Sequence, residues 1–319
     1  MNPLIRLTTL AAFATVPLLA VAQDAYPSKP VRMIVPFAPG TMADVLPRLV
    51  AEKLSAQWGQ PIVVENRPGA AGNVGAEAVA RAEPDGYTLL AAPPPPIAIN
   101  QSLYPRLGYD PAALVPVTVI GATPNVLAVH PKVEAASLQD LIALARSRPG
   151  RLSYASTGSG GTPHLTAERF KALIGASIVH VPYKGAGPAL ADLLAGRVDM
   201  MFVNLGDALR HRELRVVAVA SKQRVPSLPD VPALSETFPG FVSTTWYAIV
   251  APQKTPAALA ERLSQAIASV VRSPELMRRL RELNIEPVAS SPDATAAFIA
   301  EEVKRWRAII VEAGVKVDP

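Results

Sequence analysis

The chain alternates short apolar runs with longer segments in which apolar residues recur every three or four positions. Residues 31–35, VRMIV, form the first such run, and residues 42–54 follow it with helical spacing. The helical positions are Val45, Leu46, Leu49, Val50 and Leu54. The same order of strand, polar turn and helix recurs at residues 152–173 and 178–196. This alternation predicts an α/β fold.

The turn between the first strand and the first helix has the features of an anion site. Thr41 to Asp44 fits the Ser/Thr-x-x-Asp/Glu capping box, which marks a helix start. A strand that feeds a glycine turn at a helix start leaves backbone N–H groups pointing outward, with the positive end of the helix dipole behind them. Asp44 has two interpretations: it stabilises the helix start, or it contacts a ligand. An ordinary βα turn without a ligand is the alternative for the whole segment.

Two glycine-rich turns in the second half repeat this arrangement. Residues 157–161, TGSGG, follow a strand, and Thr162 and Pro163 have the character of an N-cap and a first helical residue. Residues 182–187, PYKGAG, follow the next strand and precede a helix that starts at Pro188. We therefore expect two facing anion-binding surfaces, one from each half of the chain.

Proline is the compositional outlier, with 33 residues, many of them at the ends of the expected elements. Pro93 to Pro96 follow the strand-like residues 88–92. A polyproline turn at the carboxyl end of a strand is stiff, and ligands of open α/β sheets bind at that end. We expect an apolar wall of the site here, with a rigid surface loop as the alternative.

The first 22 residues predict export. Arg6 precedes an apolar run, residues 7–21, which contains no acidic residue and ends at the A-x-A cleavage pattern of residues 20–22. Pro17 interrupts this run, which is short for a membrane anchor, the alternative interpretation. The chain has no cysteine and so lacks the attachment residue of a lipoprotein. These features predict a cleavable signal peptide and a soluble periplasmic protein.

Length and charge restrict the remaining possibilities. About 297 residues remain after cleavage (319 minus 22), which suits two lobes of about 100 to 200 residues each. Half of the chain is hydrophobic by residue type, which is enough for two cores. The net charge of +5 comes without a Lys/Arg block, so nucleic acid is not an expected partner.

No catalytic, metal or cofactor motif is present. Ser159 lies in GSGG, but a nucleophile elbow needs glycine where the chain has Thr157. The four histidines lack metal-ligand spacing, and a lone histidine is more often structural. Residues 69–75 read G-x-x-G-x-x-G, which is not the dinucleotide fingerprint. We expect no catalytic residue, no metal and no cofactor, and a secreted hydrolase is the less favoured alternative.

Five long blocks of the chain resemble the Bug family, the extracytoplasmic solute receptors of tripartite tricarboxylate transporters. The blocks read YPSKPVRMIVPFAPG, QPIVVENRPGAAGNVGAEAVARAEPDGYTLL, YASTGSGGTPHLTAERF, HVPYKGAGPALADLLAGRVDMMF and WYAIVAPQKTP. The resemblance implies a periplasmic binding protein-like Venus flytrap, with two α/β lobes joined by crossover strands and closing on a small carboxylate. It also implies integral membrane transporter subunits as partners, with a signalling system as the alternative, and we expect a monomer.

We place the crossovers near Thr123 and Thr245. This gives a first lobe of residues 25–123 and 245–319 and a second lobe of residues 124–244. The ligand is expected to be an aliphatic or aromatic mono- or dicarboxylate. The sequence does not name it, because backbone N–H groups and water recognise a carboxylate whatever carries it.

The family's binding positions, matched to this chain, fall in the first βα turn and in the glycine-rich turns of the second lobe. The expected ligand-binding residues are Phe37, Ala38, Pro39, Gly40, Thr41, Met42, Asp44, Pro95, Ser156, Thr157, Gly158, Gly161, Thr162, His164, Tyr183, Lys184 and Asn204. Lys184 is a candidate for a far carboxylate of the ligand.

Two positions depart from the family pattern. Thr41 and Met42 follow Gly40 where the family usually has a second glycine, and Asn204 stands where relatives often carry an aspartate. The loss of that charge argues against an amino-acid ligand.

Overall fold

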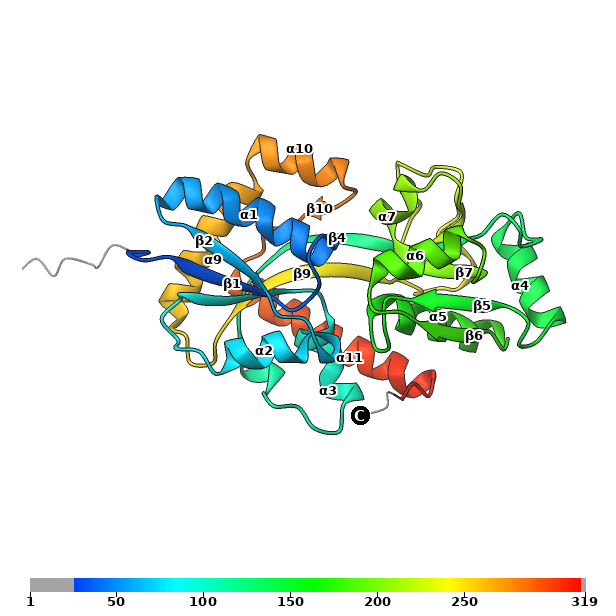
Figure 1. Cartoon of the computed structure of the whole chain (residues 1–319), viewed down its shortest axis with the longest axis horizontal. Helices are drawn as coiled ribbons and strands as arrows, with labels where there is room; N and C mark the ends of the chain where they lie inside the picture. Colours follow the sequence, from blue (N-terminus) through cyan, green and yellow to red (C-terminus); the bar gives the residue numbers. More distant parts are fainter. Residues whose placement is uncertain (1–25, 317–319) are drawn as a thin grey trace, which may run out of the picture.

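The computed structural model describes residues 26–316 and has two α/β lobes that share one mixed sheet (Figure 1). Ten strands take part, in the order β2-β1-β3-β9-β4-β7-β5-β6, and β8 and β10 pair with β4 outside this path. The expected signal peptide lies outside the described residues. Within residues 26–316, every helix is too short or too polar to cross a bilayer.

The first lobe begins with three parallel strands, β1 (Val31–Val35), β2 (Ile62–Asn66) and β3 (Thr88–Ala92). Helices cover both faces of this sheet, which is why Met33 and Ile34, on opposite faces of β1, are both fully buried. One face packs on α1 (Met42–Trp58), α9 (Ala257–Val271) and α10 (Pro274–Glu282). The other face packs on α2 (Asn73–Ala80), α3 (Asn100–Leu103) and α11 (Pro292–Glu312).

The second lobe is a smaller sheet of the same kind. Its strands are β5 (Ser153–Ser156), β6 (Val179–Pro182), β7 (Met200–Asn204) and β8 (Arg215–Val219). One face packs on α4 (Leu138–Ser147) and α5 (Thr162–Ile174), with α8 (Leu234–Thr237) beside them. The other face packs on α6 (Ala186–Leu194) and α7 (Leu205–Arg210).

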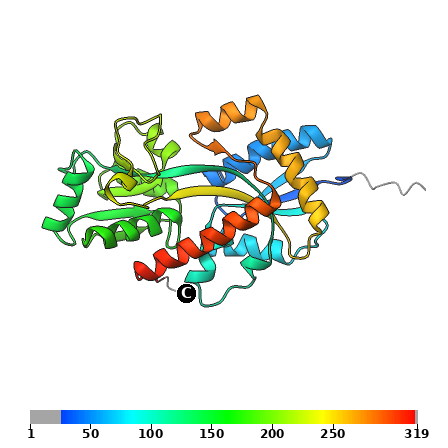
Figure 2. The same cartoon turned by 180° about the vertical axis from the view of Figure 1, so that it is seen from behind.

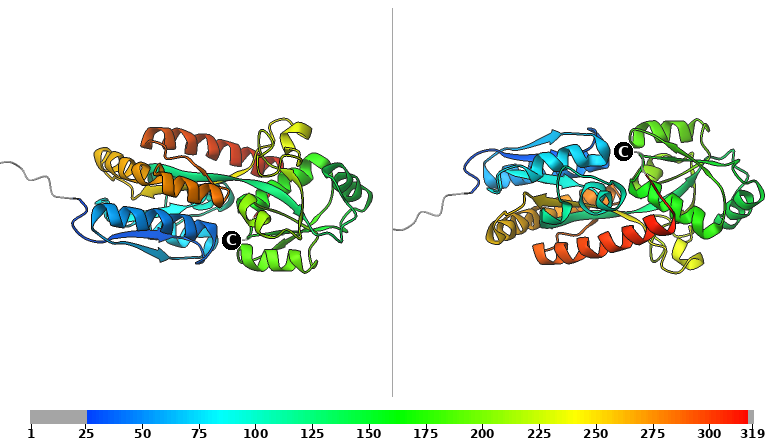
Figure 3. Two further views of the ribbon diagram at one scale, coloured as in Figure 1. Left: turned by 90° about the horizontal axis from the view of Figure 1, so that it is seen from above. Right: turned by 90° about the horizontal axis from the view of Figure 1, so that it is seen from below.

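Two long strands connect the lobes. β4 (Val115–Val129) pairs with β9 (Thr244–Ala251) through residues 115–124, and pairs with β7 and β8 through residues 125–129. In both views of Figure 3 the second lobe, in green, lies at the end of the first lobe from which β4 and β9 emerge. Thr123 and Thr245, the expected crossover positions, lie opposite each other in the β4–β9 register.

α11 lies across the crossover strands (Figure 2). Its Glu302 side chain is buried and accepts the indole N–H of Trp246 from β9 at 2.7 Å and that of Trp306 at 3.0 Å. On the opposite face, the short α7 abuts the turn after α10, since a Cβ on Gly206 would collide with the carbonyl oxygen of Leu283. α11 also packs against α5 (Thr162–Ile174), so the two lobes contact each other on both sides of the crossover.

Three loops meet at the carboxyl edge of the first sheet, because parallel strands end at the same edge. Their contact is close: a Cβ on Gly72 would meet Pro96 at 3.1 Å and the Phe37 ring at 3.3 Å. Gly72 has φ of 93°, a conformation that favours glycine.

The expectation of a stiff polyproline turn is wrong. Pro94 has helical backbone angles, and a single π-helical turn, η2 (Pro95–Ile99), starts directly after it. Pro93 to Pro96 are all buried, and the carbonyl of Pro96 accepts the hydroxyl of Tyr109 at 2.6 Å. Two shorter helical turns, η1 (Ala70–Gly72) and η3 (Pro111–Ala113), and a short strand, β10 (Glu286–Pro287), complete the first lobe.

Candidate functional site

The first helix begins where the sequence predicts, with Thr41 as its N-cap. Its capping bonds differ from the expected box. The Thr41 hydroxyl donates to the carbonyl of Ala38 at 2.9 Å, and the Asp44 carboxylate accepts the N–H of Gly40, also at 2.9 Å. The prediction of a reciprocal Thr41–Asp44 box is therefore wrong in its bonds, although Asp44 does stabilise the helix start.

Asp44 is held inside the first lobe. Its side chain is 3% exposed, and its Oδ1 accepts from Arg48 at 2.9 Å and from Asn66 at 2.8 Å. Burial raises the pKa of this carboxyl, but the bonds from Arg48, Gly40 and Asn66 outweigh burial and hold the pKa below its usual value. Its oxygens are thus occupied by groups of its own lobe, which favours the structural interpretation of Asp44.

The start of α1 leaves several donors free. The N–H groups of Thr41, Met42 and Ala43 find no hydrogen-bond acceptor among residues 26–316. Ala38, Pro39 and Gly40 are exposed, while Phe37, Thr41 and Met42 are half-buried. These N–H groups and the dipole of a 17-residue helix make an accessible positive end in the first lobe.

The start of α5 supplies a second set of free donors. The N–H groups of Thr157, Ser159 and Thr162 have no acceptor within the described part of the chain. The helix begins at Thr162, with Gly161 as the N-cap and Pro163 as the second residue, so the expected start is displaced by one position. Gly161 takes the extended backbone angles of an N-cap, with φ −69° and ψ 159°.

Buried side chains form hydrogen bonds with the backbone of the glycine-rich loop, residues 157–161. Ser156 Oγ lies 2.7 Å from His180 Nε2, and Gly158 N–H approaches Ser156 Oγ at 3.3 Å. His164 Nδ1 accepts the N–H of Gly160 at 3.1 Å. Ser156 and His164 therefore face the loop backbone, and the hydroxyl of Ser156 is fully buried.

The β6–α6 loop lies against the same glycine-rich loop. Tyr183 N–H donates to the carbonyl of Ser156 at 3.1 Å, and a Cβ on Gly158 would meet the Tyr183 carbonyl oxygen at 3.5 Å. The Tyr183 hydroxyl points away, donating to Asp192 at 2.8 Å. Lys184 is exposed at the tip of this loop.

The structure thus gathers the expected residues into two groups, one in each lobe. Phe37 to Asp44 form the first group, and Ser156 to His164 with Tyr183 and Lys184 form the second. Within residues 26–316 no hydrogen bond joins the two groups. Pro95 is buried in η2, and Asn204 ends β7 at the crossover.

A polar cluster on the crossover strands was missed by sequence reasoning. Thr162 Oγ1 and Thr245 Oγ1 lie 2.8 Å apart, Thr166 bonds Ser243, and Asn125 Nδ2 donates to Ser243 Oγ at 2.9 Å. All five side chains are buried. The available signal was the run of Thr, Asn and Ser inside otherwise apolar strands, VPVTVIGATPNVLAV and STTWYAIV. This cluster ties the start of α5 to the crossover.

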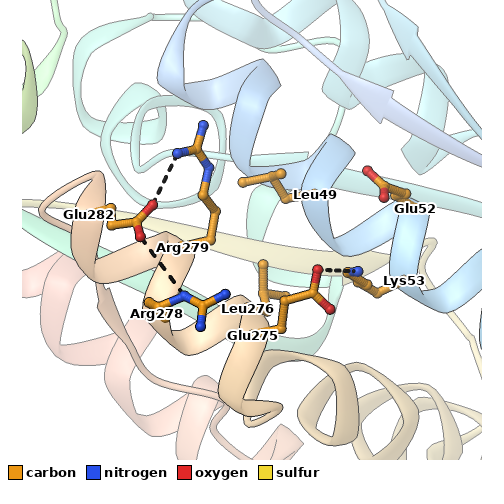
Figure 4. Close-up of a pocket in the computed structure, with 8 residues that line it drawn as sticks. All are labelled: Leu49, Glu52, Lys53, Glu275, Leu276, Arg278, Arg279 and Glu282. Carbon is orange, nitrogen blue, oxygen red and sulfur yellow. Dashed lines mark hydrogen bonds and ion pairs between the residues drawn. The ribbon is translucent and has the colours of Figure 1, made fainter.

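A surface pocket of about 230 Å³ lies between α1 and α10, away from both groups (Figure 4). Its basic side chains are paired with acidic ones: Lys53 with Glu275 at 2.8 Å, Arg279 with Glu282 at 3.1 Å and Arg278 with Glu282 at 3.9 Å. An anion would have to displace these partners, so we do not assign the ligand to this pocket.

The chain is similar to a set of solute receptors. It matches the family described as "Tripartite tricarboxylate transporter family receptor" over residues 46–315. It is 39% identical over 303 residues to "Protein BugT" of Bordetella pertussis, with 93% of each chain covered.

Solved structures agree in fold. "R. palustris Rpa4515 with adipate" matches with a TM-score of 0.86 and 37% identity, over 91% of this chain and 99% of that one. MatC from Rhodopseudomonas palustris, with bound malate, matches with a TM-score of 0.82 and 30% identity, over 89% of this chain and 100% of that one. Each of these two proteins holds a dicarboxylate.

Proposed function

Because the chain belongs to the tripartite tricarboxylate transporter receptor family, we propose that it binds a small carboxylate between its lobes and delivers it to a membrane transporter. Members of this family are periplasmic solute-binding proteins. They bind their substrates rather than transform them, so the alternative of a secreted hydrolase is wrong.

The free N–H groups at the starts of α1 and α5 carry this proposal. Each set belongs to a helix long enough to have a dipole, 17 and 13 residues, and each follows a parallel strand at its carboxyl end. One set lies in each lobe, so one carboxylate satisfies both when the lobes approach. The carboxylate of Asp44 is already neutralised by Arg48, and the first group therefore offers donors rather than a competing charge.

The ligand class is the finer part of the proposal. Adipate and malate, bound by two similar proteins, are both dicarboxylates. Lys184 is exposed on the loop beside the second group and is our candidate for the far carboxylate. An aromatic or aliphatic monocarboxylate would use the two helix starts alone.

We also propose the lobe boundaries, the route of export and the partners that the sequence analysis predicts. The first lobe comprises residues 25–123 and 245–319, the second comprises residues 124–244, and closure bends β4 and β9 where they pass from one to the other. We also propose export by a cleavable signal peptide and action as a free monomer, with integral membrane subunits as partners. A sensor partner is the alternative outcome, and a pull-down with transporter subunits distinguishes the two.

Ligand titration tests the proposal directly. A panel of adipate, malate, succinate, benzoate and phenylacetate is titrated by calorimetry, together with thermal unfolding of each mixture. At least one carboxylate should bind and raise the melting temperature, since a ligand that binds the native state stabilises it by mass action. The matching amides, which carry no charge, serve as the controls, and equal binding of acid and amide would contradict a carboxylate site.

A further inference from the structure

Two buried polar atoms at the crossover have no partner. Thr123 Oγ1 and Asn204 Oδ1 are both shielded from solvent, and neither makes a hydrogen bond within the described residues. Thr123 is 2% exposed. Buried polar atoms in native proteins are almost always paired, with protein, water or ligand. These two positions therefore call for a partner that comes from outside the chain.

The strand register puts both residues on the same face of the sheet. Thr123 lies opposite Thr245 in the β4–β9 pairing, and Asn125, two residues later on β4, lies opposite Asn204 on β7. Side chains alternate along a strand, so Thr123 and Asn125 share a face, and Asn204 shares it with them. Thr123 and Asn204 are thus diagonal neighbours on adjacent strands. Residues in this relationship are typically about 7–8 Å apart, close enough for their side chains to approach a common group.

This face lies between the two groups of free N–H donors. Thr245, opposite Thr123, lies 2.8 Å from Thr162, the first residue of α5. Tyr247, on the same face of β9, packs in the same apolar cluster as Leu46 of α1, and Met42 packs against that cluster. The start of α5 therefore contacts this face, and α1 packs in the same apolar cluster as Tyr247.

The chemistry of the two atoms selects the group they bind. Asn204 Nδ2 donates to the Tyr247 hydroxyl at 3.3 Å, so Oδ1 remains as an acceptor. The Thr123 hydroxyl can donate. A ligand hydroxyl satisfies both, because it donates its proton to Asn204 and accepts one from Thr123. A ketone or a methylene group of a ligand has no proton to donate to Asn204 Oδ1. A ligand ammonium group is also disfavoured, because the Asn204 carboxamide is neutral and cannot balance its charge.

We propose that Thr123 and Asn204 form a hydroxyl subsite and that the preferred ligand is a hydroxycarboxylate. This proposal deepens the proposed function and rests on it. The carboxylate provides attachment through the helix starts, and the hydroxyl provides selectivity at the crossover strands.

Matched ligand pairs test the subsite. Each pair differs in one hydroxyl: malate and succinate, 2-hydroxyadipate and adipate, lactate and propionate, mandelate and phenylacetate. Affinities are measured by calorimetry for the wild type, Thr123→Val and Asn204→Leu. The control is Thr118→Val, the same change at another fully buried threonine of β4, whose hydroxyl donates to the carbonyl of Val119.

The wild type should bind the hydroxy member of the best pair at least tenfold more tightly than its partner. Thr123→Val and Asn204→Leu should each reduce this ratio to below threefold by weakening the hydroxy member alone. Thr118→Val should keep the wild-type ratio. If Thr123→Val does not fold, Asn204→Leu tests the same subsite from the other strand.

Several results would overturn the hydroxyl subsite. Equal wild-type affinity for both members of every binding pair means that a fixed water satisfies the two atoms, and the carboxylate proposal then stands alone. Tighter binding of aspartate than of malate assigns the subsite to an amine. Equal weakening of both members by Thr123→Val assigns Thr123 to folding. If none of the carboxylates binds, the proposed function itself fails.

Discussion

The imidazole rings of His164 and His180 stack with their centroids 4.2 Å apart and their planes inclined by 21°. The Tyr154 ring centroid lies 4.7 Å from that of His180 and 6.4 Å from that of His164, so the three rings form one packed cluster. His164 accepts the Gly160 N–H, and His180 bonds Ser156. The stack therefore holds the loop that carries the free donors of the second lobe.

This stack predicts a loss of stability in acid. Burial, followed by the nearby His180, lowers the pKa of His164 from 6.5 to about 4, and burial also lowers the pKa of His180. Glu168 and Lys171 of α5 pair with each other beside the rings, and Tyr154 donates to Glu168. The lowered pKa of His164 corresponds to about 3 kcal/mol in the free energy of unfolding. The reason is that in acid the unfolded chain binds a proton at this imidazole and the native state does not. This stability is complete above pH 6.5 and is lost as the pH falls toward about 4.

Urea unfolding between pH 4 and pH 8 checks this expectation. His164→Asn keeps an acceptor for the Gly160 N–H but cannot titrate, so its stability should depend less on pH than that of the wild type. His130→Asn is the control, since His130 Nδ1 accepts the Lys132 N–H at 3.1 Å near the surface of the same lobe. Parallel curves for wild type and His164→Asn would contradict the role of His164.

Removal of one N–H group from the start of α1 should weaken carboxylate binding. Met42 is the first residue of the helix, where proline is tolerated, and Thr41 has φ −73° and ψ 162°, which suit a residue before proline. Met42→Pro should therefore fold normally and lose about tenfold or more in affinity, because a hydrogen bond to a charged group contributes about 1.5–3 kcal/mol. Met42→Leu keeps the N–H and is the matched control. If Met42→Pro binds the carboxylate as tightly as the wild type does, the Met42 N–H is not part of the binding site.

Asp44 should matter for stability. Asp44→Ala removes the acceptor of Gly40, Arg48 and Asn66 and should cost about 2 kcal/mol in the free energy of unfolding. Glu52→Ala, at an exposed position of the same helix, should change it by less than about 0.5 kcal/mol. Urea denaturation without ligand measures both. Equal stability of the two variants would refute the structural role of Asp44.

Lys184 should distinguish dicarboxylates from monocarboxylates. Lys184→Met is expected to weaken the binding of a dicarboxylate by up to about fivefold, because an exposed ion pair contributes at most about 1 kcal/mol. A monocarboxylate should bind as before, and added salt should reduce the difference. Lys222→Met, another exposed lysine of the second lobe, is the control. Unchanged dicarboxylate affinity in Lys184→Met would exclude a direct contact.

Ligand saturation should make the molecule more compact. Each lobe offers one set of free donors, so a ligand that uses both favours the closed arrangement. Small-angle scattering should show a smaller radius of gyration with ligand. Met42→Pro at the same ligand concentration should keep the radius of gyration that it has without ligand. An unchanged radius in wild type at confirmed saturation would show a rigid, preformed site.

The sequence predicted the elements well because their signals are local. Thr41 as N-cap, the glycine-rich turn after β5 and the apolar β1 each depend on neighbours within a few residues. The bonds at the start of α1 were not predictable in this way. Asp44 turns to Gly40 while Arg48 and Asn66 hold its other oxygen, and Asn66 lies 22 residues away on β2.

The wrong prediction at Pro93 to Pro96 and the missed polar cluster at the crossover have the same physical origin. Pro93 to Pro96 adopt a helical turn because the segment is buried and Tyr109 bonds its carbonyl at Pro96. Asn125, Thr166 and Ser243 meet only when α5 packs against the crossover strands. The helix and strand propensities of neighbouring residues do not predict either of these contacts.

The position of β9 in the sheet determines the order in which the chain can complete its lobes. β9 fills the place between β3 and β4, and it is the last long strand to be synthesised. Until residue 251 has emerged, β3 has an open edge, and the apolar faces of β1 and β3 lack α9 and α11. The second lobe, formed by an uninterrupted stretch of chain, can fold before the first. β1 and β3 are therefore synthesised early but buried late. Until then, the unfinished chain exposes a strand edge that is prone to association.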